Sequence, residues 1–190
     1  GECNIINMNI ESIGVIEPLQ ALMDSLYVLK LKIQDLLEYS FDNYKLINNS
    51  KFELKQNKKD EMKIVMFNEN HTLGNLINDY ITKYKYKDKN IIKYNNYKLV
   101  HPLDEIIEFN IHIENNDEFT DFLDKNDLKV DINNMKNRFT YVFIKTVKNI
   151  LIDLDNIINL TIKNGDIKKP SFEMEQIFEQ LEESGDEAYF

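Results

Sequence analysis

The stretch Glu69–Leu76 reads Glu-Asn-His-Thr-Leu-Gly-Asn-Leu, and it decides how the middle of the chain folds. It follows a strand candidate at Lys63–Phe67, which the polar residues Asn70, His71 and Thr72 interrupt. Thr72 is placed to cap a following helix, although Asn75 stands where a capping box would have Glu or Gln. Apolar residues then recur at helical spacing and predict a packed face: Leu73, Leu76, Ile77, Tyr80, Ile81 and Tyr84.

Strands are predicted on both sides of this helix. Residues 90–100 are strand-like, and His101-Pro102 marks a turn because the residue before proline avoids the helical region. Residues 105–113 alternate between apolar and polar side chains, which is typical of a half-buried strand. Its apolar face carries Ile107, Phe109, Ile111 and Ile113, and its polar face carries Glu108, Asn110 and His112. A shorter strand is expected near Phe52–Leu54.

Two longer helices are predicted, each with an apolar residue every three or four positions. The first follows Pro18, and its stripe is Leu19, Leu22, Leu26, Leu29, Ile33 and Leu36. The second spans 135–163, ends near Gly165 and Pro170, and carries Phe143, Val147, Ile150, Leu154 and Ile157. Such stripes favour helix-to-helix packing, either within the chain or on a partner.

The chain is therefore expected to be α+β, with a small mixed or antiparallel sheet packed on helices. Residues 1–40 are expected to hold a strand at 5–16 and the first long helix, and residues 41–61 a linker. Residues 62–163 form the main domain, with an acidic, exposed insertion at 114–134. Residues 164–190 are expected to be a solvated acidic tail.

Charge and composition exclude several classes of protein. The net charge is −10, divided as −4 over residues 1–50, +5 over 51–100 and −11 over 101–190. Phosphate neutralisation dominates DNA affinity, so direct contact with nucleic acid is not expected. No apolar run is long enough to span a membrane, and no signal peptide opens the chain. The single Cys3 fits a reducing compartment, and no cofactor is implied.

Three sharper interpretations compete with plainer ones. Six lysines and four tyrosines interleave between positions 83 and 98, as in a single-strand binder, but lysines also protect a sheet edge. His71, His101 and His112 could join a metal site, yet their spacing matches no helical ligand pair. No metal and no catalytic residue is assigned. Gly74 lacks the further glycines of a phosphate loop and more simply permits close helix packing.

The residues Glu69, His71, Thr72, Leu73, Gly74, Asn75 and Leu76 resemble the signature of the small alpha-like subunit of RNA polymerases, which is the L type in archaea. The family usually has an acidic residue where this chain has Asn70. About 25 residues later, His101-Pro102-Leu103 resembles the family's turn, and an alternating strand and a long helix follow in the family's order.

A second resemblance covers the first 40 residues. Met8–Val15, read with the long helix behind it, is similar to the end of the larger alpha-like subunit, which is the D type in archaea. One chain would thus join the two alpha-like partners. Such fusions are a feature of some large DNA viruses, and the richness in Asn, Lys and Ile fits an AT-rich genome.

The resemblance implies a non-catalytic assembly subunit of a DNA-directed RNA polymerase, an alpha-like dimerisation platform that recruits the second-largest subunit. Other implied partners are small zinc-binding assembly subunits. The implied location is the host cytoplasm and the virion for a viral protein, and otherwise the nucleus. A helix-mediated scaffold unrelated to transcription would also show two heptad helices. An enzyme is the weakest alternative, because no nucleophile–base pair has a useful spacing.

Overall fold

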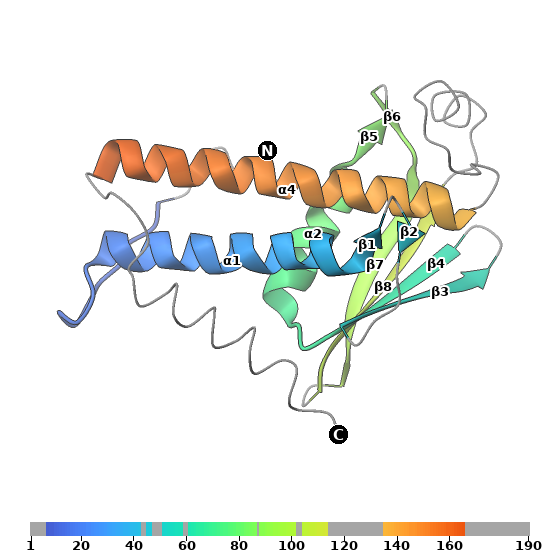
Figure 1. The fold of residues 1–190 in the computed structure, drawn as a ribbon, viewed down its shortest axis with the longest axis horizontal. Helices are drawn as coiled ribbons and strands as arrows, with labels where there is room; N and C mark the ends of the chain where they lie inside the picture. The colour runs from blue at the N-terminus through green and yellow to red at the C-terminus, as the bar shows by residue number, and fades with distance from the viewer. Residues whose placement is uncertain are drawn as a thin grey trace. The chain divides into compact units, whose positions relative to one another are not determined.

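The computed structural model describes residues 7–42, 45–46, 51–58, 61–86, 88–101, 104–113 and 135–165. Within these residues the chain is α+β, as predicted, with three helices and a four-stranded antiparallel sheet (Figure 1). Contacts divide the chain into unit 1, residues 1–32 with 153–190, and unit 2, residues 33–152. The two long helices, α1 (Pro18–Ser40) and α4 (Met135–Gly165), contribute residues to both units.

Unit 2 is built on a sheet with the strand order β3-β4-β8-β7. The strands are β3 (Phe52–Lys58), β4 (Glu61–Phe67), β7 (Ile92–His101) and β8 (Asp104–Ile113), and each neighbouring pair is antiparallel. The strands predicted at 63–67, 90–100 and 105–113 correspond to β4, β7 and β8. Strand β3 extends the short strand expected near Phe52 and lies within the segment that the sequence presents as a linker.

The sheet has one apolar and one polar face, because directly paired residues of antiparallel strands share a face. The register places Ile64 opposite Phe109 and Phe109 opposite Tyr97 on the apolar face. It places Lys63 opposite Asn110 on the polar face. The alternation predicted for residues 105–113 is thereby confirmed: Ile107, Phe109, Ile111 and Ile113 are all buried.

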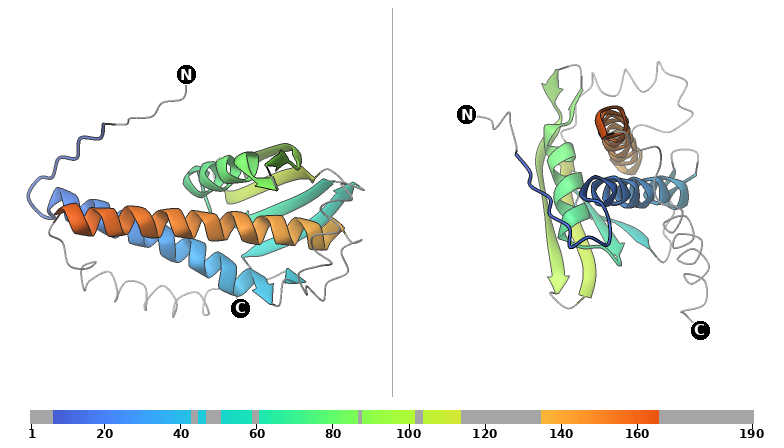
Figure 2. Two further views of the ribbon diagram at one scale, coloured as in Figure 1. Left: turned by 90° about the horizontal axis from the view of Figure 1, so that it is seen from above. Right: turned by 90° about the vertical axis from the view of Figure 1, so that its left-hand side faces the viewer.

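Two helices supply the core over the apolar face of unit 2. Helix α2 (His71–Lys83) packs on β7 and β8, as the right-hand view of Figure 2 also shows. From α4, the Phe143 ring lies 5.8 Å from that of Phe52 on β3 and 6.0 Å from that of Phe139. The fully buried large side chains of this core include Phe52, Phe109, Phe139, Phe143, Met62, Ile64, Met66, Leu73 and Ile77.

The strand predicted at 5–16 is wrong for the residues described, because residues 7–13 have no regular structure. A strand needs a neighbour for its backbone groups, and no described strand pairs with this segment. Its side chains are exposed, with Ile13 98% exposed. The Ser12 hydroxyl accepts a hydrogen bond from the Gly14 N–H, and Gly14 has φ +94°, so a turn replaces the extended run.

Two minor hairpins complete the described fold. Strand β1 (Phe41–Asp42) pairs with β2 (Lys45–Leu46), and β5 (Lys85–Tyr86) pairs with β6 (Lys89–Asn90). The insertion at 114–134, Pro102 and residues 166–190 lie outside the described residues. None of the described helices is both long enough and apolar enough to cross a membrane.

Candidate assembly interface

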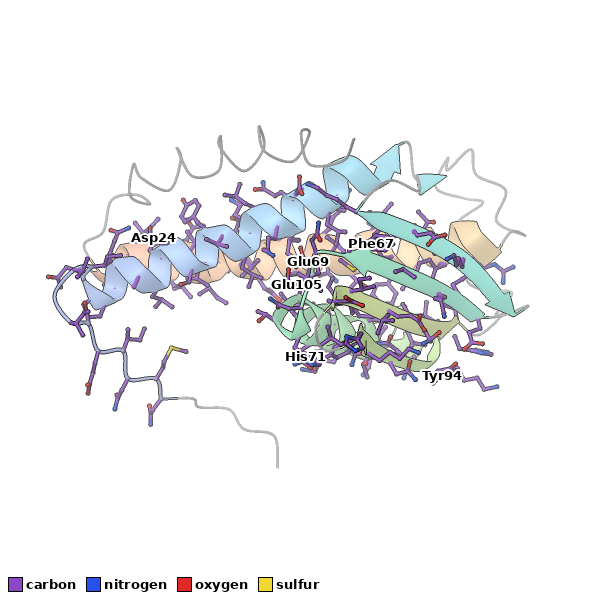
Figure 3. All side chains as sticks on the ribbon, turned by 90° about the horizontal axis from the view of Figure 1, so that it is seen from below. Asp24, Phe67, Glu69, His71, Tyr94 and Glu105 are labelled. Carbon is purple, nitrogen blue, oxygen red and sulfur yellow. The ribbon has the colours of Figure 1, made fainter. Side chains whose placement is uncertain are left out.

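The start of α2 is fixed by Asn70, not by Thr72. The Asn70 side chain accepts a hydrogen bond from the Thr72 N–H at 3.0 Å, and its backbone is extended, with φ −127°. The Glu69 N–H donates to the Glu105 carbonyl at 2.9 Å, which ties the cap to the start of β8 (Figure 3). The expectation that Thr72 caps the helix is therefore wrong, since asparagine is the stronger cap and stands two residues earlier.

Replacing this cap should destabilise the domain measurably. We expect Asn70→Ala to lower the free energy of unfolding by about 1 kcal/mol, because it removes the acceptor for the Thr72 N–H. Asn75→Ala, an exposed change on the same helix, should have no such effect. Urea unfolding of both variants measures the difference, and equal stability would contradict the cap.

The family-like residues after the cap meet strand β7 at Tyr97. The Tyr97 hydroxyl lies 3.0 Å from Nδ1 of His71, and the two rings meet edge-on at 5.8 Å. A Cβ added to Gly74 would lie 2.5 Å from Cε2 of Tyr97. Gly74 therefore lets α2 approach β7 closely, as expected of a residue without a side chain. His71 is exposed and acts here as a hydrogen-bond partner of Tyr97.

A second contact between α2 and β7 is not evident from the sequence. Nδ2 of Asn95 lies 3.0 Å from the Asn78 carbonyl, 2.9 Å from Oδ1 of Asn78 and 3.2 Å from Oγ1 of Thr82. Asn95 stands beside Asn96, so the sequence alone does not show which of the two asparagines faces the helix. Only the strand register reveals that Asn95 points to the helix and Asn96 to the polar face.

The remaining signature residues divide between the core and the surface. Leu73 is buried, and Leu76 and Glu69 are half-buried. Thr72 and Asn75 are exposed on α2. His101 is exposed and pairs in register with Asp104, where β7 turns into β8. The signature thus shapes the joint between α2 and the sheet.

In unit 1, α1 and α4 pack against each other in antiparallel directions. Nζ of Lys30 lies 2.7 Å from Oδ1 of Asp155, and a Cβ added to Gly165 would overlap the Leu19 side chain. Contacts thus join position 30 to 155 and position 19 to 165. Residue numbers rise along α4 in the direction in which they fall along α1, so the two helices are antiparallel. Helix-to-helix packing within the chain is one of the two expected arrangements.

The predicted apolar stripes are buried to different extents. In unit 2, Ile33, Phe143, Val147 and Ile150 are buried, and Leu36 is half-buried. In unit 1, Leu154 is buried, whereas Leu22, Leu26 and Leu29 are half-buried and Leu19 is 36% exposed.

The end of the second stripe falls one residue later than the sequence pattern suggested. Ile157 is 46% exposed, and its neighbour Ile158 is buried instead. A straight helix has 3.6 residues per turn, so positions spaced seven residues apart rotate around the helix by about 20° per repeat. The last residue of such a stripe therefore turns away from the buried face of the helix. The role of these residues in dimerisation remains a prediction.

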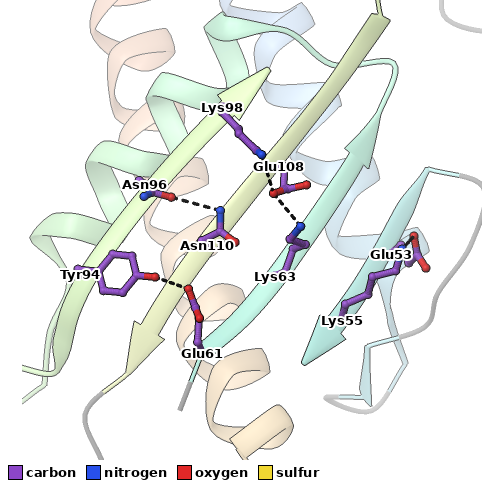
Figure 4. Close-up of polar contacts among 9 residues, drawn as sticks. All are labelled: Glu53, Lys55, Glu61, Lys63, Tyr94, Asn96, Lys98, Glu108 and Asn110. Atoms are coloured by element: carbon purple, nitrogen blue, oxygen red, sulfur yellow. Dashed lines mark hydrogen bonds and ion pairs between the residues drawn. The ribbon is translucent and has the colours of Figure 1, made fainter. Parts of the chain in front are cut away.

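The polar face of the sheet is cross-linked by its own side chains (Figure 4). Glu108 lies 2.8 Å from Nζ of Lys63 and 3.3 Å from Nζ of Lys98. The Tyr94 hydroxyl donates to Glu61, and this hydrogen bond, with burial, raises the pKa of Tyr94. Tyr94 and Tyr97 lie on opposite faces of the sheet, so the lysine–tyrosine stretch does not form one stacking surface.

Glu108 should make the stability of the domain pH-dependent. Burial raises the pKa of Glu108, but hydrogen bonds and charges from Lys63 and Lys98 outweigh it and hold the pKa below its ordinary value of 4.5. A carboxyl group whose pKa is lower in the folded state than in the unfolded chain stabilises the fold at pH values above the unfolded-state pKa. This stabilisation is lost as the pH falls through the folded-state pKa. We expect Glu108→Gln to lose roughly 1–2 kcal/mol at neutral pH.

The pH profile of unfolding tests this arrangement. The parent and Glu108→Gln should converge in stability as the pH falls below 4.5. Glu53→Gln is the matched control, because Glu53 pairs with the exposed Lys55 and surface ion pairs contribute little. A constant difference between Glu108→Gln and the parent across the acid range would contradict the assignment.

The histidines do not meet in the structure. His71 starts α2, His101 ends β7, and His112 lies on β8 beside the Tyr94 ring. Among the described residues, no group of three or more His, Cys, Asp or Glu is placed to hold a metal ion.

Comparison with known families gives one match. Residues 61–138 match the family of the RNA polymerase Rpb3/Rpb11 dimerisation domain. The match begins with β4 and reaches the first turn of α4, so it includes α2, its cap and the β7–β8 hairpin. No curated protein matches the chain. Residues 61–138 are thus similar to the Rpb3/Rpb11 dimerisation domain, and this match supports an alpha-like RNA polymerase subunit.

Proposed function

We propose that the chain is a non-catalytic assembly subunit of a DNA-directed RNA polymerase. The observation that carries this is the match of residues 61–138 to the dimerisation domain, together with the joint between α2 and β7 within it. The signature residues there have structural roles. Leu73 packs in the core, Asn70 caps α2 by accepting a hydrogen bond from the Thr72 N–H, and Gly74 permits close packing. This favours a platform for other subunits.

We further propose that the chain joins both alpha-like partners, with residues 1–40 from the larger one and residues 62–163 from the smaller one. The antiparallel packing of α1 on α4 in unit 1 supports this, because the resemblance implies that the two alpha-like partners pair through their long helices. A covalent connection makes the pairing intramolecular and raises the effective concentration to about the millimolar range.

The platform would recruit the second-largest subunit and bind small zinc-binding assembly subunits. Its location follows from that of the polymerase. For a large DNA virus this is the host cytoplasm and the virion, which the composition favours, and for a cellular polymerase it is the nucleus.

Affinity purification of the tagged full chain from cells that express the polymerase tests the function. The large polymerase subunits should co-purify with the parent chain. Ile158→Asp places a charge in the buried side of α4 within unit 1 and should reduce this recovery at least tenfold. Asn159→Asp adds the same charge to the exposed position on the other side of Ile158 and should leave recovery unchanged.

A scaffold unrelated to transcription is the second candidate, favoured by the half-buried leucines of α1. It would give self-association of the chain without polymerase subunits. Recovery of the chain alone, with equal yields from the parent and both variants, would count against the polymerase proposal.

A further inference from the structure

The outer edge of β7 pairs with no other strand among the described residues. β7 is the last strand in the order β3-β4-β8-β7, so only the side that faces β8 is bonded to a neighbour. The register with β8 shifts after Ile92 and again after Leu99, and residues 94–99 form the regular part of the edge between these shifts. An edge strand presents a row of backbone N–H and C=O groups, so this edge can accept one more strand.

The chain also contains a strand-like segment that has no partner strand. Polar and apolar side chains alternate along residues 7–11, as in a half-buried strand. Every residue of this segment is exposed, with Met8 69% and Ile10 37% exposed, and no described strand pairs with it. The hydrogen bond from the Gly14 N–H to the Ser12 hydroxyl ends the extended run. The segment therefore has the side-chain pattern of a strand without the backbone bonds of one.

The apolar side chains of the segment match those of the β7 edge in one antiparallel alignment. This alignment places Ile10 opposite Tyr97. Met8 then falls opposite Leu99, because residue numbers run in opposite directions along the two strands. Tyr97 and Leu99 point to the apolar face of the sheet, where they pair with buried residues of β8, yet both are only half-buried. Cross-strand pairs of aromatic and aliphatic side chains stabilise a sheet, so this alignment would cover all four side chains.

The same alignment brings opposite charges together on the polar face of the sheet. It places Glu11 opposite Asn96, so that Lys98 becomes the diagonal neighbour of Glu11, within reach of long side chains. The Lys98 side chain is 62% exposed although its Nζ lies 3.3 Å from Glu108, so it can pair with a second carboxylate. Lysine at a sheet edge discourages pairing with an apolar strand, and a strand that carries a carboxylate offsets this effect.

We propose that residues 7–12 of one chain add to β7 of a second copy as a fifth strand of its sheet. The segment pairs with no described strand of its own chain, and a second copy supplies a β7 edge that matches it in apolar pattern and in charge. Reciprocal exchange fills both edges and closes the assembly as a symmetric dimer. The proposal rests on this segment and on β7, so it holds whether or not the chain binds polymerase.

Sedimentation velocity of the full chain over a range of concentrations tests the dimer. The parent should show a reversible monomer–dimer equilibrium. Ile10→Asp places a charge beside Tyr97 on the apolar face and should raise the dissociation constant of the dimer about tenfold or more. Ile13→Asp is the matched control, because Ile13 is 98% exposed and lies beyond the proposed strand, and it should leave the constant unchanged. A parent that stays monomeric, or equal constants for the two variants, would overturn the proposal.

Disulfide trapping between two differently tagged chains tests the alignment. Both chains carry Cys3→Ser, one also carries Asn9→Cys, and the other carries Lys98→Cys. Asn9 falls opposite Lys98 in the proposed register, at a separation that a disulfide can bridge. The mixed disulfide should form about tenfold or more faster than with Lys55→Cys in the second chain, because Lys55 lies on β3 at the other edge of the sheet. Equal rates for both mixtures, as random collision or pairing within one chain would give, would contradict the proposal.

Discussion

Phe143→Ala is expected to lower the free energy of unfolding by about 3–5 kcal/mol, because it opens a cavity where three aromatic rings meet. Phe143 is fully buried, and its ring contacts those of Phe52 on β3 and Phe139 on α4. It therefore joins the last helix to an edge strand of the sheet. Urea unfolding followed by far-UV circular dichroism measures the loss.

Lys145→Ala is the control for this substitution. Lys145 lies two residues further along α4 and is exposed, and its ammonium lies over the Tyr141 ring at 5.6 Å. Its replacement should change stability by less than about 0.5 kcal/mol. A loss below about 1 kcal/mol for Phe143→Ala would show that α4 does not complete the core of unit 2.

Gly74→Val is expected to destabilise the domain by about 2–3 kcal/mol through overpacking. A Cβ at this position would lie 2.5 Å from Cε2 and 2.8 Å from Cδ2 of Tyr97. The tyrosine ring cannot move freely, because it also packs on two other rings. Its centroid lies 5.7 Å from that of the Phe109 ring, and the His71 ring meets it edge-on. Either α2 or β7 must shift.

A double-mutant cycle separates this clash from other effects of valine in a helix. Tyr97→Ala removes the ring and should make Gly74→Val much less destabilising, so the two changes should be strongly non-additive. Asn75→Val, at the exposed neighbouring position, reports the helix propensity of valine alone. Additive effects of Gly74→Val and Tyr97→Ala would exclude the close contact as the cause.

The sheet and its faces could be predicted from the sequence because strand alternation is a local signal. Ile107, Phe109 and their polar neighbours alternate without interruption, so the pattern fixes which face is buried. The strand predicted at 5–16 shows the limit of this signal. Its alternation is similar, but a strand requires a partner, and the sequence does not show whether one is present.

The candidate interface could be predicted only in part. Gly74 and His71 stood out by residue type, but the contact of both with Tyr97 depends on which strand lies under α2. Asn95 could not be distinguished from Asn96 without the strand register. Ile157 and Ile158 are both isoleucine, and only the pitch of the helix decides which is buried.

The contacts between Leu19 and Gly165 and between Lys30 and Asp155 join residues that are 146 (165 − 19) and 125 (155 − 30) positions apart in the sequence. Contacts of such long sequence range form slowly, because a long loop must be closed before they stabilise anything. During synthesis, α1 leaves the ribosome first and must wait for α4 to emerge. Its leucines are therefore exposed until α4 has been synthesised, and a chaperone would bind the nascent chain at this helix during that time.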